Sequence, residues 1–281
     1  MAWFGYFLTF IIPNNHKPEV RSLRQNIFLL SLLTFLIISC NQASGPIRII
    51  QYTINSIDTI NTISYNQSQS KGNSKNHENV KLTERAFYYE RLISDSIIGA
   101  KAHIYFFDTS YVFLEDIFDG NTLIRKLNRD SSARVFDLLK YPDLKKNPFW
   151  GKTSPYVIQY MIKYAIENQD YYMFELGQDK FVDGRECYTV KTILIKKALM
   201  PGFHKFENDT NRMETMILFI DKLNYYPLRI RMEVYFIDNP DDIYFTENTF
   251  KNIKFNPDLN ENLFNTSEEV IEGFRINEIK P

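Results

Sequence analysis

The stretch YVFLEDIFDGNTLIRKL, residues 111–127, decides the fold. Two short runs rich in aromatic and branched apolar residues flank the pair Asp119-Gly120. Asp-Gly is a strong signal for a tight hairpin turn, because both central residues of such a turn need backbone angles that these residue types tolerate. The stretch therefore predicts two antiparallel strands that are adjacent in the sequence and in the sheet.

Similar runs recur along the chain, and short turns separate most of them. The composition agrees with a sheet protein, since it includes 23 Phe and 18 Tyr but only 10 Gly and 11 Pro. About ten strands are expected in one large, strongly curved antiparallel sheet. The expected strands are RAFYYERLI, AKAHIYFF, YVFLEDIF, NTLIRKL, ARVFDLL, YYMFEL, ECYTVKTILI, METMILFI, PLRIRMEVYFI and IYFTENTFKNIKF.

Two helices are expected, one N-terminal and one central, on the concave side of the sheet. The first lies within residues 47–60, where isoleucines recur every three or four positions. The second follows Ser154, a candidate N-cap, and Pro155, which suits a first helical position. Its apolar stripe contains Ile158, Met161, Ile162 and Ala165, and Tyr156, Tyr160 and Tyr164 lie beside it. A core helix that caps a sheet explains this stripe as well as a cavity-lining helix does.

Two polar stretches are expected to be mobile. Residues 41–46 follow Cys40 and resemble a tether, and residues 66–80 are rich in Asn, Ser and Gln with few apolar positions. The second stretch is interpreted as a long hairpin loop or a flexible segment. Limited proteolysis is therefore expected to cut both stretches before it cuts the sheet.

The N-terminal region predicts a signal peptide and a lipid anchor. Residues 27–39 are nearly all apolar, which is too short for a comfortable transmembrane helix, and Lys17, Arg21 and Arg24 supply a positive flank. The sequence Ile-Ile-Ser-Cys that ends at Cys40 resembles the bacterial lipobox. That resemblance implies diacylation of Cys40, cleavage after Ser39 and acylation of the new N-terminus. The alternatives are an uncleaved signal anchor and a cysteine that ends a core helix.

Composition and motifs exclude several functional classes. Lys and Arg total 33 and Asp and Glu total 34, so the net charge of -1 favours no nucleic-acid partner. No histidine has a second ligand at metal-binding spacing, and the chain contains no phosphate-binding loop or nucleophile elbow. Cys187 is interpreted as a small core residue, with a redox role as the alternative. We therefore expect no cofactor, no metal site and no enzymatic activity.

From about Ile47 to Phe264, the chain resembles the LolA/LolB superfamily of bacterial periplasmic lipoprotein carriers. It is most similar to the LolA-like domains that precede thioredoxin modules in lipid-anchored, TlpA-type thiol-disulfide reductases. The resemblance rests on Val182-Asp183-Gly184 followed by Tyr188 and Val190, on MILFIDKLNYYPLRI, and on FTENTFKNIKFNPDLNENLF. It implies an open half-barrel, residues 47–266, whose helices line or cover an apolar cavity. With the lipobox, the expected division is a signal peptide at residues 1–39, a lipidated cysteine and tether at 40–46, the half-barrel, and a C-terminal tail at 267–281.

This chain departs from the family pattern in two ways. Soluble carriers have no lipid anchor, so Cys40 fits a membrane-tethered protein that faces the periplasm, most simply at the outer membrane. The thioredoxin-linked relatives continue into a CxxC domain, whereas this sequence ends at Pro281.

Two functions remain open. The first is the binding of an acyl chain or a lipoprotein in an apolar cavity, and the second is a filled-core interaction domain that acts beside a thioredoxin-like partner. We expect the cavity to be open, so a tryptophan at Ala165 should reduce uptake of a fluorescent fatty acid and leave the melting temperature nearly unchanged. In a filled core, the same substitution should reduce stability. The residues expected to line the cavity are Ile104, Phe106, Val112, Leu114, Ile158, Tyr160, Met161, Ile162 and Ala165.

Cys40→Ala should abolish lipidation and leave an unprocessed precursor, because only the cysteine thiol can form the thioether to the lipid. Incorporation of radiolabelled palmitate in the native host measures this directly. Undiminished labelling of the mutant would show that Cys40 is not the anchor.

Overall fold

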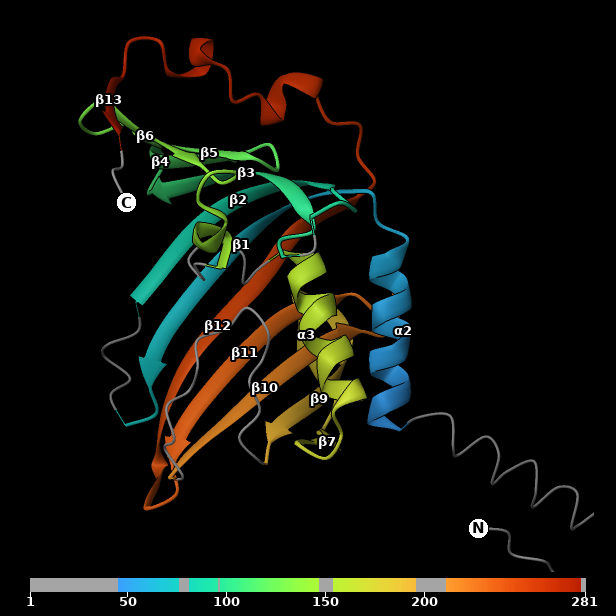
Figure 1. Ribbon diagram of the computed structural model, residues 1–281. Helices are drawn as coiled ribbons and strands as arrows, with labels where there is room; N and C mark the ends of the chain where they lie inside the picture. The colour runs from blue at the N-terminus through green and yellow to red at the C-terminus, as the bar shows by residue number, and fades with distance from the viewer. Residues whose placement is uncertain (1–44, 76–80, 96, 147–153, 196–210, 279–281) are drawn as a thin grey trace, which may run out of the picture. The chain divides into compact units, whose positions relative to one another are not determined.

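A computed structural model describes residues 45–75, 81–95, 97–146, 154–195 and 211–278 (Figure 1). The expected signal peptide and Cys40 lie outside the described residues, as does most of the expected tether. Among the described residues, no helix is both long and apolar enough to cross a bilayer.

Within the described residues, thirteen strands form one open, curved sheet, so the predicted fold class is confirmed (Figure 1). The strand order is β13-β6-β5-β4-β3-β2-β1-β12-β11-β10-β9-β7, and β8 pairs with β9. All neighbours are antiparallel except β13 and β6. The strands are β1 (Thr62–Asn73), β2 (Lys81–Arg91), β3 (Ala100–Asp108), β4 (Tyr111–Phe118), β5 (Thr122–Leu127), β6 (Ser132–Asp137), β7 (Tyr172–Leu176), β8 (Lys180–Val182), β9 (Arg185–Leu194), β10 (Arg212–Asp221), β11 (Pro227–Phe236), β12 (Asn239–Phe255) and β13 (Arg275–Glu278).

Three strands were not among the ten expected, and β1 is the most important of them. Residues 66–73 belong to β1, which lies in the middle of the sheet between β2 and β12. The prediction of a loop over residues 66–80 is therefore wrong for residues 66–73. Tyr65, Gln67 and Gln69 are buried while their neighbours are more exposed, so the strand alternates as a sheet requires. Glutamine occupies two of the buried positions, which conceals the alternation of apolar residues that marks a strand.

The hairpin at Asp119-Gly120 forms as its sequence predicts. Phe118 of β4 faces Leu123 of β5, and Gly120 has a φ of 112°. The Asp119 carboxylate accepts hydrogen bonds from the backbone N–H groups of Asn121 at 2.7 Å and Thr122 at 2.8 Å. This side chain therefore supplies partners for backbone donors that the turn would otherwise leave unpaired.

Two helices, α2 (Pro46–Asp58) and α3 (Pro155–Glu167), lie on the concave side of the sheet (Figure 1). Ser154 is the N-cap of α3, because its Oγ accepts a hydrogen bond from the Tyr156 N–H at 3.3 Å, and Pro155 occupies the first turn. The expected apolar stripe of α3 is buried, and so are Ile50, Ile54 and Ile57 of the α2 stripe, whereas Ile47 at its start is 38% exposed. The short helices are η3 (Pro142–Lys146), η4 (Glu261–Phe264) and η5 (Glu268–Ile271).

The C-terminal segment, residues 256–278, crosses the outer face of the first half of the sheet. Ile271 of η5 packs on Ile117 and Ile124, which point away from the helices, and β13 extends the sheet beside β6. The part of residues 267–281 that is described therefore adds to the folded sheet.

A buried charge network holds this segment to the sheet. His103 donates from Nε2 to Glu115 at 2.7 Å, and its Nδ1 lies 2.7 Å from the carbonyl oxygen of Leu263. Lys126 pairs with the other carboxylate oxygen of Glu115 at 2.7 Å. Burial alone would raise the pKa of Glu115, but the hydrogen bonds and charges of His103 and Lys126 outweigh burial and lower it. Glu115 is therefore ionised, and each of its carboxylate oxygens has a partner.

Glu115→Gln should destabilise the protein by roughly 1.5–3 kcal/mol at pH 7, because His103 and Lys126 lose an ionised acceptor. The folded pKa of Glu115 lies below the unfolded value of about 4.3, so its contribution is present above that pH and is lost as the pH falls through the lowered pKa. Urea unfolding at several pH values should show the difference from wild type shrinking in acid. Glu84→Gln, at an exposed glutamate, is the control. Equal effects of the two substitutions at pH 7 would contradict this account.

Candidate functional site

The concave face is the candidate site, and its two parts differ. Under α2 and α3, side chains from both helices and from the sheet form one large cluster of buried apolar residues. The far ends of β1, β2 and β12 extend past the two helices (Figure 1). The concave face thus combines a packed region beneath the helices with a continuation of the same sheet surface beyond them.

The four predicted positions of the α3 stripe lie in the packed region. Ile158, Met161, Ile162 and Ala165 are buried, and Ala165 is 0% exposed. Tyr160 lies on the other side of the helix and is 43% exposed. The structure therefore brings four of the five helical candidates together and directs Tyr160 toward solvent.

A register shift between β3 and β4 separates the predicted cavity residues of these strands into two groups. Ile104 and Phe106 alternate on β3, and Leu114 of β4 lies opposite Phe106 on the same concave face. A shift in register after Phe106 then pairs Val112 with Phe107, which points to the convex face. The structure therefore places Ile104, Phe106 and Leu114 together and separates Val112 from them. Nothing in the sequence between residues 106 and 114 marks this bulge.

Polar side chains of the concave face form a row that the sequence did not reveal. The row comprises Asn248 of β12, Gln67 and Gln69 of β1, Arg85 of β2, Asp116 of β4 and Arg125 of β5. It could not be found from the sequence because residues 67 and 69 were assigned to a loop. The register of β1 with β2 and β12 is what places these residues beside one another.

Burial and nearby charges shift the pKa values of the acidic and basic residues in this row. Burial lowers the pKa of the Arg85 guanidinium, and the charges of Tyr89 and Asp116 oppose that shift. Burial also raises the pKa of Asp116, although Arg125 donates two hydrogen bonds to its carboxylate at 2.7 Å and 2.6 Å. Arg85 lies over the ring of Phe106, with its guanidinium carbon 4.8 Å from the ring centre.

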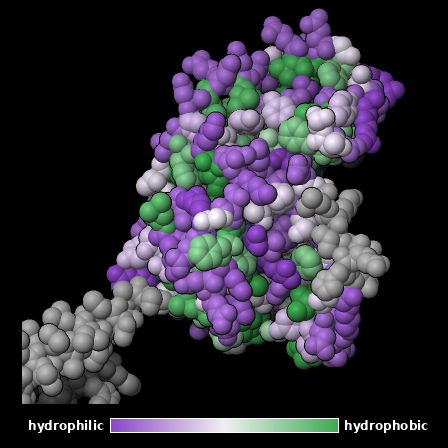
Figure 2. Space-filling model, turned by 180° about the vertical axis from the view of Figure 1, so that it is seen from behind, coloured by the Kyte–Doolittle hydropathy of each residue, from purple (hydrophilic) through white to green (hydrophobic). Residues whose placement is uncertain are grey.

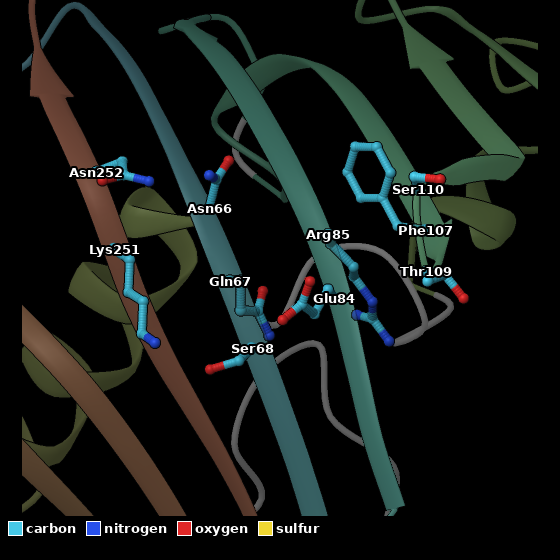
Figure 3. Close-up of a pocket in the computed structure, with 10 residues that line it drawn as sticks. All are labelled: Asn66, Gln67, Ser68, Glu84, Arg85, Phe107, Thr109, Ser110, Lys251 and Asn252. Atoms are coloured by element: carbon cyan, nitrogen blue, oxygen red, sulfur yellow. The ribbon is translucent and has the colours of Figure 1, made fainter.

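A separate pocket of about 350 Å³ opens around the tip of the β3–β4 hairpin (Figure 3). Most of the side chains that line this pocket are polar. The surface on the side of the sheet opposite to the helices is also largely polar, and hydrophobic side chains form only small groups there (Figure 2). The pocket is therefore distinct from the apolar concave surface that was expected to bind a ligand. Its lining residues are Asn66, Gln67, Ser68, Glu84, Arg85, Phe107, Thr109, Ser110, Lys251 and Asn252.

Cys187 is a free, buried cysteine at the start of β9. Burial raises the pKa of its thiol to about 11, and the charge of Asp221 adds to the shift. The thiol is therefore protonated at neutral pH and is a poor nucleophile. Among the described residues, no three His, Cys, Asp or Glu side chains lie together as a set of metal ligands.

No family model matches the chain, and no curated protein matches it either. Solved structures are similar over most of the chain. An outer membrane lipoprotein-sorting protein domain from Vibrio parahaemolyticus is 13% identical with a TM-score of 0.37, and the match covers 81% of this chain and 98% of that domain. The lipoprotein LppX of Mycobacterium tuberculosis is 11% identical with a TM-score of 0.42, covering 77% and 99%.

A LolA superfamily protein from Nitrosomonas europaea is 9% identical with a TM-score of 0.35, and the match covers 80% of this chain and 99% of that protein. Likeness at this level concerns the fold, so the function of this chain has to be argued from its own residues.

Ala165→Trp should destabilise the protein by about 1–3 kcal/mol, because Ala165 is fully buried in the packed region and the larger ring forces its neighbours to move. Tyr160→Trp is the matched control on the same helix, and it should change stability by less than about 0.5 kcal/mol because Tyr160 is exposed. Urea unfolding of both variants measures the difference. A tolerated tryptophan at position 165 would show open space beneath α3.

Proposed function

We propose that this protein is a lipid-anchored, periplasm-facing bacterial lipoprotein whose concave face binds an acyl chain, either free or carried by another lipoprotein. The binding is non-catalytic. The anchor is Cys40, and the outer membrane is the membrane it would occupy.

The observation that carries this proposal is the apolar surface on the concave face around β3, β4 and β11. Phe106, Leu114 and Met232 are only partly buried, although they lie on the same face as the fully buried cluster under the helices. Partly buried apolar side chains that line a concave surface are what an acyl chain requires, because the chain gains free energy in proportion to the apolar area removed from water.

The position of the first helix supports an anchor close to the domain. Gly45, the N-cap of α2, lies five positions after Cys40, with four residues between them. Fully extended, that length reaches about 17 Å. Acyl chains on Cys40 would therefore keep the binding domain at the membrane surface, where acyl-chain compounds are concentrated.

The buried charges on the concave face favour binding over catalysis. Asp116 is fully engaged by Arg125, and its carboxylate is not available to transfer a proton to a ligand. The thiol of Cys187 lies among buried core residues and is protonated. We therefore assign structural rather than catalytic roles to Asp116 and Cys187.

The packed region supports a second candidate, a filled-core interaction domain that acts beside a thioredoxin-like partner. Ile158, Ile162 and Ala165 are almost completely buried, so the space under α3 is filled by side chains. Under this alternative, the partner binds an outer surface and no acyl chain enters.

Phe106→Ser should weaken the binding of a fluorescent fatty acid by about tenfold or more, because it removes a partly buried aromatic ring from the concave face. Phe107→Ser is the matched control, since the next residue of β3 points to the convex face, and it should change the affinity by less than about twofold. The measurement is a fluorescence titration of the full chain in lipid nanodiscs, with a melting curve for each variant. No uptake by the wild type, or equal losses in both variants, would favour the interaction domain.

A further inference from the structure

The polar row on the concave face has a defined direction of hydrogen bonding. Arg85 donates from Nη2 to Gln69 Oε1 at 3.3 Å, which turns the amide nitrogen of Gln69 toward Asn248. Gln69 Nε2 donates to Asn248 Oδ1 at 2.7 Å, and Gln67 Nε2 donates to the same oxygen at 2.5 Å. Because an arginine can only donate, it fixes every amide orientation along this chain of bonds.

Two polar atoms of the residues in this network make no hydrogen bond themselves within the described part of the chain. Gln67 Oε1 is an acceptor and Arg85 Nε is a donor; both are buried, and neither has a hydrogen-bond partner among the described residues. Gln67 itself is only 2% exposed. A buried polar atom without a partner costs about 1–3 kcal/mol, so folded proteins rarely leave one unless another group meets it.

These two residues are direct neighbours across two strands. Gln67 of β1 is paired with Arg85 of β2, so their side chains leave the same face of the sheet at adjacent points. Thr83, two residues from Arg85 on the same face, has a third buried oxygen without a partner. Three such atoms thus lie close together on two adjacent strands, while others lie on β7, β9 and beside the start of β11.

The surroundings of this pair are polar on one side and apolar on the other. Gln67 and Arg85 also line the largely polar pocket at the β3–β4 hairpin. On the concave face, Arg85 is paired with Phe106 of β3 and lies over its ring, and Leu114 is opposite Phe106. Phe87, the next residue of β2 on that face, is buried. A ligand that reaches Gln67 and Arg85 along the concave face past Phe106 must therefore be mostly apolar there and must carry one polar group with both a donor and an acceptor.

We propose that Gln67 and Arg85 form a polar subsite for the amide group of an N-acylated compound. The amide N–H donates to Gln67 Oε1, and the amide carbonyl accepts from Arg85 Nε, while the acyl chain lies on Phe106 and Leu114. An ester offers only acceptors, and so does a carboxylate, so either leaves Gln67 Oε1 without a donor. This inference rests on the proposed acyl-chain binding and adds the chemical class of the ligand.

The test compares two competitors that differ in one group, oleamide and methyl oleate, against a fluorescent acyl probe on the full chain in lipid nanodiscs. The wild type should bind oleamide about tenfold more tightly than methyl oleate, since one extra hydrogen bond to a buried acceptor contributes about 1.4 kcal/mol. Gln67→Leu should bring the two affinities within about twofold of each other.

Ser68→Ala is the matched control, because Ser68 is the next residue of β1 and faces the convex side, and it should keep the amide preference. Arg85→Lys keeps the charge but removes Nε, which donates to the carbonyl of either competitor, so it should weaken both and keep the amide preference. Gln67→Met replaces Gln67→Leu if that variant does not fold. Equal affinities of the wild type for the two competitors, or a preference that survives Gln67→Leu, would overturn the subsite alone. If neither competitor displaces the probe, or the probe does not bind, the proposed function fails as well.

Discussion

The antiparallel pairing of β1 with β12 is the constraint on which the rest of the structure depends. It joins a strand near the start of the described chain to one near its end, from Ile63 opposite Phe255 to Asn73 opposite Tyr244. Without it, the first half of the sheet, β1 to β6, and the second half, β7 to β12, would have no shared edge. Contacts of such long sequence separation cost loop-closure entropy, which the long ladder of backbone hydrogen bonds and the buried side chains on both strands must offset.

The same pairing also brings polar side chains together on the otherwise apolar concave face. It sets Gln67 and Gln69 beside Asn248, and the pairing of β1 with β2 sets them beside Arg85. A sheet that was apolar throughout this face would bind an acyl chain in any position along it, since the hydrophobic effect has no direction. A polar group at one place fixes the position of the ligand, because a hydrogen bond requires a short distance and a defined angle.

Local signals in the sequence predicted the elements that depend on local chemistry. Asp119-Gly120 predicted a hairpin, Ser154-Pro155 predicted the start of α3, and the spacing of Ile158, Ile162 and Ala165 predicted its buried side. Each of these needs only neighbours within a few residues. The sequence also carried enough alternating runs to predict one curved antiparallel sheet. What it did not reveal was decided by distant partners: the central place of β1 rests on Asn248 as a partner for its glutamines, and the bulge that turns Val112 to the convex face rests on the fit between β3 and β4.

The central claim is that the concave face holds an acyl-chain compound in the cell. Native mass spectrometry of the full-length protein, extracted gently from its own host membrane, tests this most directly, because it weighs the protein together with whatever it carries. The account predicts a population heavier than the lipidated protein by the mass of a compound with an acyl chain, and loss of that extra mass when the protein is unfolded. A spectrum that contains only the unliganded lipoprotein, under conditions that preserve other lipid complexes, would contradict it.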